Sequence, residues 1–325
     1  MSAVLALHDV SVAFRRGRAN PTPVLDRVSF DLMPGEILGI VGESGSGKSV
    51  TALAIMGLLG ERGVVTGGSI TLAEHGDLLR LQPVALRRIR GRQIAMIFQE
   101  PMTSLNPLLT IGRQISEAIR AHFVVDSDTA RRRTLDLLAQ MGIPAPDKRI
   151  DDYPHQMSGG MRQRVMIAIA MACRPRVLIA DEPTTALDVT IQAQILELIR
   201  ALRAETGSAV LLITHDMGVV AELTDRVVVM YAGQVVETAC VDALFNDPRH
   251  PYTRMLQRSM PSAAVKVARL SVIPGSLPAP RDMPFGCRFH LRCPEAGERC
   301  RTEPQVLIPV TNDPTRAARC WRVTA

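Results

Sequence analysis

The segment GESGSGKS, residues 42–49, follows the apolar run EILGIV and precedes VTALAIMGLL. This G-x-x-x-x-G-K-S pattern lies between a predicted strand and a predicted helix, the context in which it indicates a phosphate-binding loop. The glycines let backbone N–H groups turn toward phosphate oxygens, and the helix N-terminus adds partial positive charge. Lys48 is expected to reach the β- and γ-phosphates, and Ser49 to bind Mg²⁺. The residues expected to contact nucleotide are Gly42, Ser44, Gly45, Ser46, Gly47, Lys48, Ser49 and Val50.

A second acidic element follows a different apolar run, in RVLIADEP, residues 176–183. A buried strand of this kind delivers carboxylates to its C-terminal edge, where ligands bind in open α/β sheets. Asp181 is expected to hold Mg²⁺, usually through water, and Glu182 to orient or deprotonate an attacking water. Together with the phosphate loop, this element predicts a nucleotide-hydrolysing site.

The remaining pattern predicts an α/β fold. Short Ile- and Val-rich runs bounded by turn residues indicate buried strands. From about Met102 to Cys173 the pattern is almost entirely helical, which predicts a helical insertion, and residues 191–204 form one apolar helical face. After about Phe245, Pro and Gly become frequent, so an irregular appended segment of short strands, turns and loops is expected. The predicted strands are residues 36–41, 94–98, 177–180, 210–214 and 226–231.

Length and composition favour a soluble protein of about two domains. The chain has 325 residues and a net charge of +6, and its positive charge is scattered, which favours a solvated basic surface over a nucleic-acid partner. No apolar run approaches the ~18–20 residues needed to span a bilayer. The start, MSAVLALHDV, lacks a basic signal region, so a cytoplasmic protein is expected, in which lasting disulfides are uncommon.

Further motifs lie around these two elements, in a fixed order. MSGGMRQR, residues 157–164, resembles the signature, usually LSGGQ, of the ATP-binding subunits of ABC transporters. Gln99 ends the strand IAMIFQ as that family's Q-loop does, TALD (185–188) matches its D-loop, and His215 in LLITHD matches its switch histidine. Phe14 lies where an aromatic ring stacks on adenine in the family, although a core position would also explain it.

The resemblance covers roughly residues 4–240 and implies a fold and a domain plan. The expected fold is a P-loop NTPase of the ABC ATPase type, with a RecA-like core and antiparallel β and helical subdomains. Residues 1–245 would form the nucleotide-binding domain, with a helical subdomain at about 101–173. Residues 246–325 would form a C-terminal extension of the oligopeptide-transporter type that contains a four-cysteine cluster.

The family resemblance also assigns roles to individual residues. Ser158, Gly159 and Gly160 would begin a helix whose free N–H donors contact the γ-phosphate held by the opposite subunit, so that two subunits enclose two ATP molecules. Met161 and Met157 replace the usual Gln and Leu, and a backbone contact tolerates both changes. Water would attack the γ-phosphate in line. The implied catalytic residues are Glu182, His215, Gln99 and Lys48, with Gln99 also on Mg²⁺ and Asp188 at the nucleotide.

Several segments, among them EPMTSLNP (100–107) and RHPYTRML (249–256), look like the peptide-importer branch of the family. This branch implies two membrane-spanning permeases, a second and paralogous ATP-binding subunit, and an extracytoplasmic binding protein. The chain would then lie peripherally on the cytoplasmic face of the inner membrane and dock through the helical region beginning at Pro101. Importers of nickel, glutathione and antimicrobial peptides share these motifs. A soluble ABC ATPase of translation or DNA repair would carry tandem cassettes or long coiled-coil insertions. This sequence has neither feature, which disfavours that class of protein.

The last part of the chain contains four of its six cysteines. Their spacing includes no C-x-x-C and is a poor zinc-finger match. In a reducing compartment they suit a tetrahedral thiolate site, and zinc, an iron–sulfur cluster and free thiols all remain open. The family resemblance favours a [4Fe–4S] cluster, with zinc as the alternative. The interleaved Arg288, Arg292 and Arg299 fit a negatively charged cluster, or else are solvated. The four cysteines are Cys287, Cys293, Cys300 and Cys320.

Overall fold

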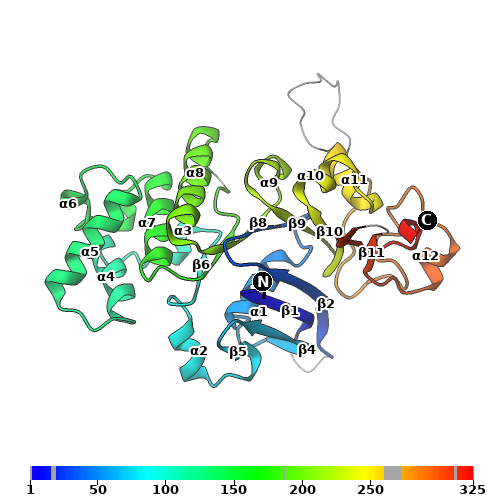
Figure 1. Cartoon of the computed structure of the whole chain (residues 1–325), viewed down its shortest axis with the longest axis horizontal. Coiled ribbons are helices and arrows are strands. Elements are labelled where there is room, and N and C mark those ends of the chain that lie inside the picture. Colours follow the sequence, from blue (N-terminus) through cyan, green and yellow to red (C-terminus); the bar gives the residue numbers. More distant parts are fainter. Residues whose placement is uncertain (1, 16–19, 186, 260–271, 311–312, 325) are drawn as a thin grey trace. The chain divides into compact units, whose positions relative to one another are not determined.

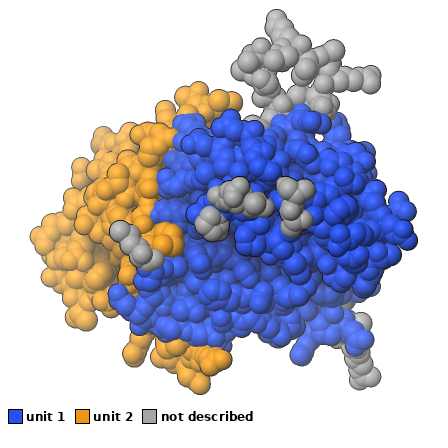
Figure 2. All heavy atoms as spheres, turned by 45° about the vertical axis from the view of Figure 1, so that its right-hand side comes forward, with its two compact units in different colours: residues 1–32, 36–79, 213–325 blue, residues 33–35, 80–212 orange. Residues whose placement is uncertain are grey.

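The computed structural model describes residues 2–15, 20–185, 187–259, 272–310 and 313–324. The chain divides into two compact units, which Figure 2 shows in different colours. Unit 1 comprises residues 1–32, 36–79 and 213–325, and unit 2 comprises residues 33–35 and 80–212. The chain enters the main part of unit 2 at the short turn η1 (Leu78–Arg80). Over the described residues, no helix has the length and apolar character to cross a membrane.

Unit 1 contains an antiparallel sheet with the strand order β2-β1-β4-β5 (Figure 1). The register of β1 against β2 shifts near Asp9 and Arg27, two non-glycine residues with a φ of 48°. Such bulges bend and twist a strand, and here they bring polar side chains to one point on the sheet. The strands are β1 (Leu5–Phe14), β2 (Thr22–Leu32), β4 (Gly63–Leu72) and β5 (Gly76–Asp77).

A second set of strands in unit 1 has the order β11-β12-β10-β9-β3. All five residues of β3 are buried, and β3 runs parallel to β9, as expected for the strand that carries a phosphate loop. Near the end of the chain, β12 adds to β10 by antiparallel pairing of Ala318 with Glu237. The strands are β3 (Ile37–Val41), β9 (Arg226–Tyr231), β10 (Gln234–Cys240), β11 (Ile308–Val310) and β12 (Asp313–Ala318).

Unit 1 contains helices that the sequence pattern did not predict, and the longest of those after Phe245 is α11. Helix α11 lies in the segment expected to be irregular, and it is stabilised by proline at its first turn and by His250, whose Nδ1 accepts from the Tyr252 N–H. Tyr252 and Leu256 then pack into a buried cluster with β9 and β10. The helices are α1 (Lys48–Met56), α9 (Met217–Leu223), α10 (Val241–Asn246), α11 (Pro251–Arg258), α12 (Glu298–Thr302) and η3 (Trp321–Thr324).

Unit 2 combines three sheet strands with the helical insertion. The strand order is β8-β7-β6, and β6 runs parallel to β7. The strands are β6 (Ile94–Ile97), β7 (Val177–Asp181) and β8 (Ala209–Thr214). Helices α4, α5 and α7 pack against one another (Figure 1), so the predicted helical insertion is confirmed. The helices are α2 (Pro83–Ile89), α3 (Pro101–Ser104), α4 (Ile111–Arg120), α5 (Ser127–Gln140), α6 (Pro146–Arg149), η2 (Pro154–Gln156), α7 (Gly159–Met171) and α8 (Val189–Thr206).

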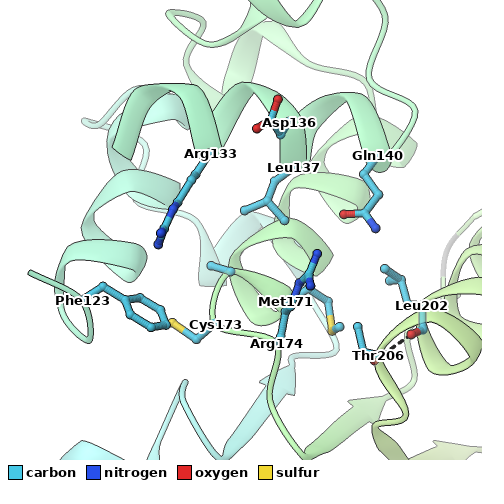
Figure 3. A pocket seen from close by; sticks show the side chains of 11 residues that line it. Phe123, Arg133, Asp136, Leu137, Gln140, Met171, Cys173, Arg174, Leu202 and Thr206 are labelled. Atoms are coloured by element: carbon cyan, nitrogen blue, oxygen red, sulfur yellow. Dashed lines mark hydrogen bonds between the residues drawn. The ribbon is translucent and has the colours of Figure 1, made fainter. Parts of the chain in front are cut away.

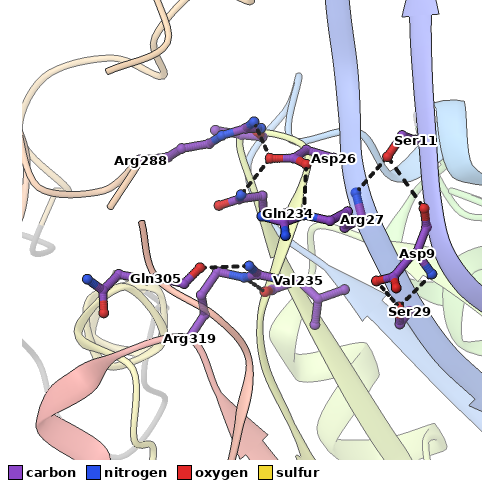
Figure 4. Close-up of polar contacts among 11 residues, drawn as sticks. Asp9, Ser11, Asp26, Arg27, Ser29, Gln234, Val235, Arg288, Gln305 and Arg319 are labelled. Carbon is purple, nitrogen blue, oxygen red and sulfur yellow. Dashed lines mark hydrogen bonds and ion pairs between the residues drawn. The ribbon is translucent and has the colours of Figure 1, made fainter. Parts of the chain in front are cut away.

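Long-range polar contacts anchor the C-terminal segment within unit 1 (Figure 4). The Arg288 guanidinium donates to Asp26 Oδ2 on β2 at 2.7 Å, which satisfies a partly buried carboxylate. Arg319 is buried and donates through Nε to the Val235 carbonyl on β10 at 2.7 Å and through Nη1 to the Gln305 carbonyl at 2.9 Å. The segment is therefore integrated into unit 1 by contacts with both of its sheets.

Candidate functional site

The phosphate loop occupies the turn between β3 and α1, and its backbone requires glycine. Gly42 has a φ of 153°, and a Cβ there would lie 2.2 Å from the Met230 carbonyl oxygen. Gly47 has a φ of 105°, and a Cβ there would lie 2.6 Å from Leu25 Cδ2. Positive φ strains a side chain at both positions, and at Gly42 the Met230 backbone also leaves no space for one.

The polar groups of the loop point into its concave side. Lys48 is 4% exposed, and its Nζ donates to the Gly42 carbonyl at 2.7 Å and the Glu43 carbonyl at 3.1 Å. The N-cap residue of α1 is Gly47, which has no side chain of its own to cap the helix, and the N-terminus of a helix favours an anion. Ser46 Oγ is buried without a hydrogen-bond partner among the described residues. This arrangement suits the phosphates of a nucleotide.

Two further candidates lie in unit 1. Phe14 ends β1, paired with Thr22 and Gly63, and its ring is partly exposed. His215 is exposed directly after β8, and the next residue, Asp216, caps α9 by accepting from the Gly218 N–H at 2.8 Å. The capped helix start therefore fixes the backbone on which His215 lies.

In unit 2 the parallel pairing of β6 and β7 brings two predicted residues together. Asp181 is the last residue of β7 and is 4% exposed. The next residue, Glu182, has a φ of 47°, and its Oε2 accepts from Gln99 Nε2 at 3.0 Å and from Thr185 Oγ1 at 2.8 Å. A carboxylate held in this way is oriented to accept a further hydrogen bond, including one from water.

The signature residues lie at the start of a long helix in unit 2. Ser158 caps α7, and its Oγ accepts from the Met161 N–H at 3.3 Å. Gly159 and Gly160 form the first turn, where N–H groups lack partners within the helix. A Cβ on Gly160 would lie 2.9 Å from Ile191 Cγ2 of α8, which explains the small residue there. The expected helix start is therefore confirmed.

The D-loop candidate Asp188 also caps a helix. Its Oδ1 accepts from the Ile191 N–H at 2.9 Å and so begins α8. The other residues of the TALD motif are Thr185, which donates to Glu182, and Leu187. Ala186 lies outside the described residues.

A separate cavity in unit 2 lies among α5, the end of α7 and α8 (Figure 3). Phe123, Arg133 and Cys173 line it, with the Arg133 guanidinium 5.5 Å from the centre of the Phe123 ring. Burial raises the pKa of the Cys173 thiol. None of the residues predicted to bind nucleotide lines this cavity, so it is not the nucleotide site.

The four C-terminal cysteines line one small cavity, although they are far apart in sequence. All six cysteines of the chain are free thiols. Burial raises the pKa of Cys287 to about 11 and also raises the pKa of Cys293 and Cys320, which favours neutral thiols. Across the residues that the structure describes, no group of three or more Cys, His, Asp or Glu side chains is arranged to hold a metal ion. The four thiols therefore line one cavity, but in the described structure their side chains are not arranged as the ligands of a metal ion.

The arginines near these cysteines have other partners than the predicted thiolate cluster. Arg288 pairs with Asp26, and Arg299 pairs with Glu303 at 2.9 Å. Arg292 is buried and pairs with Glu43 of the phosphate loop at 2.6 Å. Each of the three arginines therefore has a carboxylate partner, and a role beside charged thiolates stays a prediction. Nothing in the sequence indicated that Arg292 and Glu43 pair, because Arg292 was associated only with the cysteines and Glu43 occupies an unspecified position of the G-x-x-x-x-G-K-S pattern.

Comparisons with known proteins agree with this geometry. The profile of the ABC transporter family matches residues 25–185, and that of the oligopeptide/dipeptide transporter C-terminal region matches residues 236–300. The dipeptide transport ATP-binding protein DppD of Escherichia coli (strain K12) is 52% identical over 94% of this chain and 93% of its own length. The oligopeptide transport ATP-binding protein AppD of Bacillus subtilis (strain 168) is 49% identical over 99% and 97%.

Solved structures show the same fold. The dimeric ATP-binding cassette MJ0796, in a post-hydrolysis state bound to ADP and phosphate, matches with a TM-score of 0.64 and 30% identity, covering 73% of this chain and 98% of that one. The ATP-binding subunit of another ABC transporter matches with a TM-score of 0.60 and 28% identity over 74% and 91%. The likeness covers most of these cassettes.

Proposed function

Because this chain belongs to the ABC transporter family, among the dipeptide and oligopeptide transport ATP-binding proteins, we propose that it hydrolyses ATP to power peptide import. The observation that carries the proposal is the identity of about half of all residues with such proteins over nearly the whole chain. The phosphate loop of unit 1 supports it, because its glycine backbone and buried Lys48 suit a triphosphate. Residues 1–245 are the nucleotide-binding domain in this proposal, and residues 246–325 are its C-terminal extension.

The chemistry that we propose is attack of water on the γ-phosphorus of ATP, which breaks the bond from that phosphorus to the β-phosphate oxygen and releases ADP. Glu182 accepts a hydrogen bond from the water and takes its proton, while Gln99 and Thr185 hold the carboxylate in place. His215 and Lys48 stabilise charge on the γ-phosphate, and Phe14 stacks on adenine. The oxygen donors of Ser49, Gln99 and Asp181 suit Mg²⁺, which when bound neutralises charge on the phosphates.

Two ATP-binding subunits act together in this proposal. Ser158, Gly159 and Gly160 direct N–H donors from the start of α7 toward the γ-phosphate held by the opposite subunit, and Asp188 lies at the same nucleotide. The dimeric MJ0796 cassette with ADP and phosphate supports this arrangement. The second subunit is a paralogue, and both dock on two membrane-spanning permeases at the cytoplasmic face of the inner membrane. The helical region that begins at Pro101 is the docking surface, and an extracytoplasmic binding protein delivers the substrate.

The hydrolytic role is tested by Glu182→Gln, which keeps the shape of the side chain and removes its basicity. Hydrolysis is expected to slow about 10²- to 10⁴-fold while ATP is still bound. Glu197→Gln is the matched control, because Glu197 is exposed on α8 and pairs only with Arg200 among the contacts described. Hydrolysis by Glu182→Gln at the wild-type rate would show that Glu182 is not the base.

The transported substrate is tested in cells that lack the chain. Uptake of a radiolabelled dipeptide should be lost and should return with the wild-type gene. Nickel, glutathione and antimicrobial peptides are the alternative cargoes. Loss of nickel uptake with unchanged dipeptide uptake would overturn the peptide assignment and leave the ATPase assignment standing.

We further propose that Cys287, Cys293, Cys300 and Cys320 hold a [4Fe–4S] cluster, with zinc as the alternative. Their common cavity supports a shared ligand. Because burial favours neutral thiols, binding must accompany loss of protons and a small rearrangement of the side chains. Protein purified without oxygen should be coloured and contain iron. Colourless protein that contains stoichiometric zinc would support the alternative, and metal-free protein would exclude both.

A further inference from the structure

A buried ion pair joins the cysteine-containing segment to the phosphate loop. The side chain of Arg292, between Cys287 and Cys293, is 5% exposed. Its Nη1 donates to Glu43 Oε2 at 2.6 Å and its Nη2 donates to Glu43 Oε1 at 2.9 Å. Two parallel hydrogen bonds of this kind fix both the position and the plane of the carboxylate.

Glu43 is held at its backbone as well as at its side chain. Its N–H donates to Tyr252 Oη of α11 at 2.9 Å, and its carbonyl accepts from Lys48 Nζ at 3.1 Å. The same Lys48 group also holds the Gly42 carbonyl. The conformation of the loop's first turn therefore depends on partners that lie more than 200 residues away, because the hydroxyl and the guanidinium both come from the C-terminal part of the chain.

Arg292 is itself rigidly placed. Its Nε donates to the Pro274 carbonyl at 2.8 Å, and its guanidinium lies 5.8 Å from the centre of the Tyr231 ring. Tyr231, Tyr252 and Phe289 pack together with ring centres 4.7 to 5.3 Å apart. A cation with this many fixed partners loses little freedom on pairing and so can orient its partner. The hydrogen bonds to Glu43 and Tyr231 also hold the pKa of Arg292 above its usual range.

The segment reaches the loop at a second point. A Cβ on Gly45 would lie 3.3 Å from Leu277 Cδ2, so Leu277 lies against the loop close to the Arg292–Glu43 ion pair. Ile273 belongs to the buried cluster that contains Tyr252 and Phe289, and the partly buried Leu277 packs against this cluster. The C-terminal segment therefore contacts the loop twice, through the apolar side chain of Leu277 and through the ion pair of Arg292. Both contacts would be lost if this segment detached from the loop.

We propose that Arg292 is a positioning residue of the nucleotide site, which holds Glu43 so that the phosphate loop keeps its ATP-binding conformation. The inference rests on the proposed ATPase function and adds the C-terminal segment to its machinery. Without the guanidinium, a partly buried negative charge would be left at the loop that receives a polyanionic triphosphate. Loss of Arg292 should lower ATP affinity more than the rate of the chemical step, because Arg292 shapes the loop that binds ATP and does not contact the reacting atoms.

The test compares Arg292→Gln, Arg292→Lys, Glu43→Gln and the double variant Glu43→Gln/Arg292→Gln in the full chain. Binding of a non-hydrolysable ATP analogue with Mg²⁺ is measured by calorimetry, and KM and kcat are measured for ATP. Arg292→Gln should weaken binding and raise KM roughly 10- to 100-fold with a smaller change in kcat. Arg292→Lys, which keeps the charge but not the fork, should be intermediate.

The double variant separates positioning from general damage to the fold. Replacing both charges by amides removes the uncompensated carboxylate, so affinity should recover by about fivefold or more relative to Arg292→Gln. Arg281→Gln is the matched control, because Arg281 carries the same charge and is exposed in the same segment. Hydrogen exchange of residues 42–49 should quicken in Arg292→Gln and remain unchanged in the control.

Three results would overturn the proposal. These are wild-type affinity of Arg292→Gln, equal loss in Arg281→Gln, and no recovery in the double variant. If Lys48→Ala abolishes binding while Arg292→Gln does not weaken it, the ATPase function stands and Arg292 has no positioning role. If the wild-type chain binds no ATP analogue, the proposed function and this inference both fail.

Discussion

Glu237 offers a sharp test of how the C-terminal part of the chain is joined to the fold. This residue of β10 is 1% exposed. Its Oε1 accepts from the Arg249 N–H at 2.7 Å, and its Oε2 accepts from the His250 N–H at 2.8 Å. One carboxylate thereby satisfies two backbone donors at the entrance to α11. The same helix carries Tyr252, the partner of the phosphate loop.

The substitution Glu237→Gln changes one of the two acceptors into a donor. One backbone N–H then loses its partner and faces an NH₂ group, and a buried unsatisfied donor costs about 1–3 kcal/mol. The remaining hydrogen bond also loses its charge, which adds to the destabilisation. An opposite effect comes from desolvation: burial of the carboxylate is costly, as the raised pKa of Glu237 indicates, and the neutral amide avoids part of that cost. We expect the free energy of unfolding to fall by about 2–4 kcal/mol, which corresponds to roughly 5–15 °C in Tm.

Urea denaturation followed by circular dichroism measures this free energy, and thermal unfolding gives the change in Tm. Glu197→Gln is the control, since Glu197 is exposed and its pair with Arg200 lies on the surface. That change should cost less than about 1 kcal/mol. If Glu237→Gln is no more destabilising than Glu197→Gln, the two backbone hydrogen bonds do not stabilise the fold as reasoned.

Three other changes have defined outcomes. Gly42→Ala should abolish ATP binding in a nucleotide-binding assay, because its Cβ would collide with the Met230 carbonyl; retained affinity would contradict the loop geometry. Asp216→Ala removes the cap of α9 and should lower the free energy of unfolding by about 1 kcal/mol in urea, whereas Asp216→Asn should largely preserve it. In the native protein, a maleimide should label exposed Cys240 before Cys173, whose pKa is raised by burial, and mass spectrometry of early time points would reveal the reverse order.

Much of the fold could be predicted because strands and helices report local periodicity. The expected run at residues 226–231 coincides with β9, and the run at 94–98 differs from β6 by one residue. Helix α11 was missed because its eight residues begin within a Pro-rich stretch and depend on Tyr252 entering a core built by other strands. The four cysteines were expected together and do line one cavity, but their spacing carried no information on side-chain geometry.

The phosphate loop could be predicted from the amino-acid sequence alone, because its conformation depends on consecutive residues. Glycines at 42 and 47 permit positive φ, and Lys48 reaches back to carbonyls only a few residues away. The distant groups that hold the loop, by contrast, are set by tertiary packing. Arg292 meets Glu43 across 249 positions, and Gln99 meets Glu182 through the pairing of two parallel strands. Such contacts depend on strand register and the packing of a shared core, which no local pattern encodes.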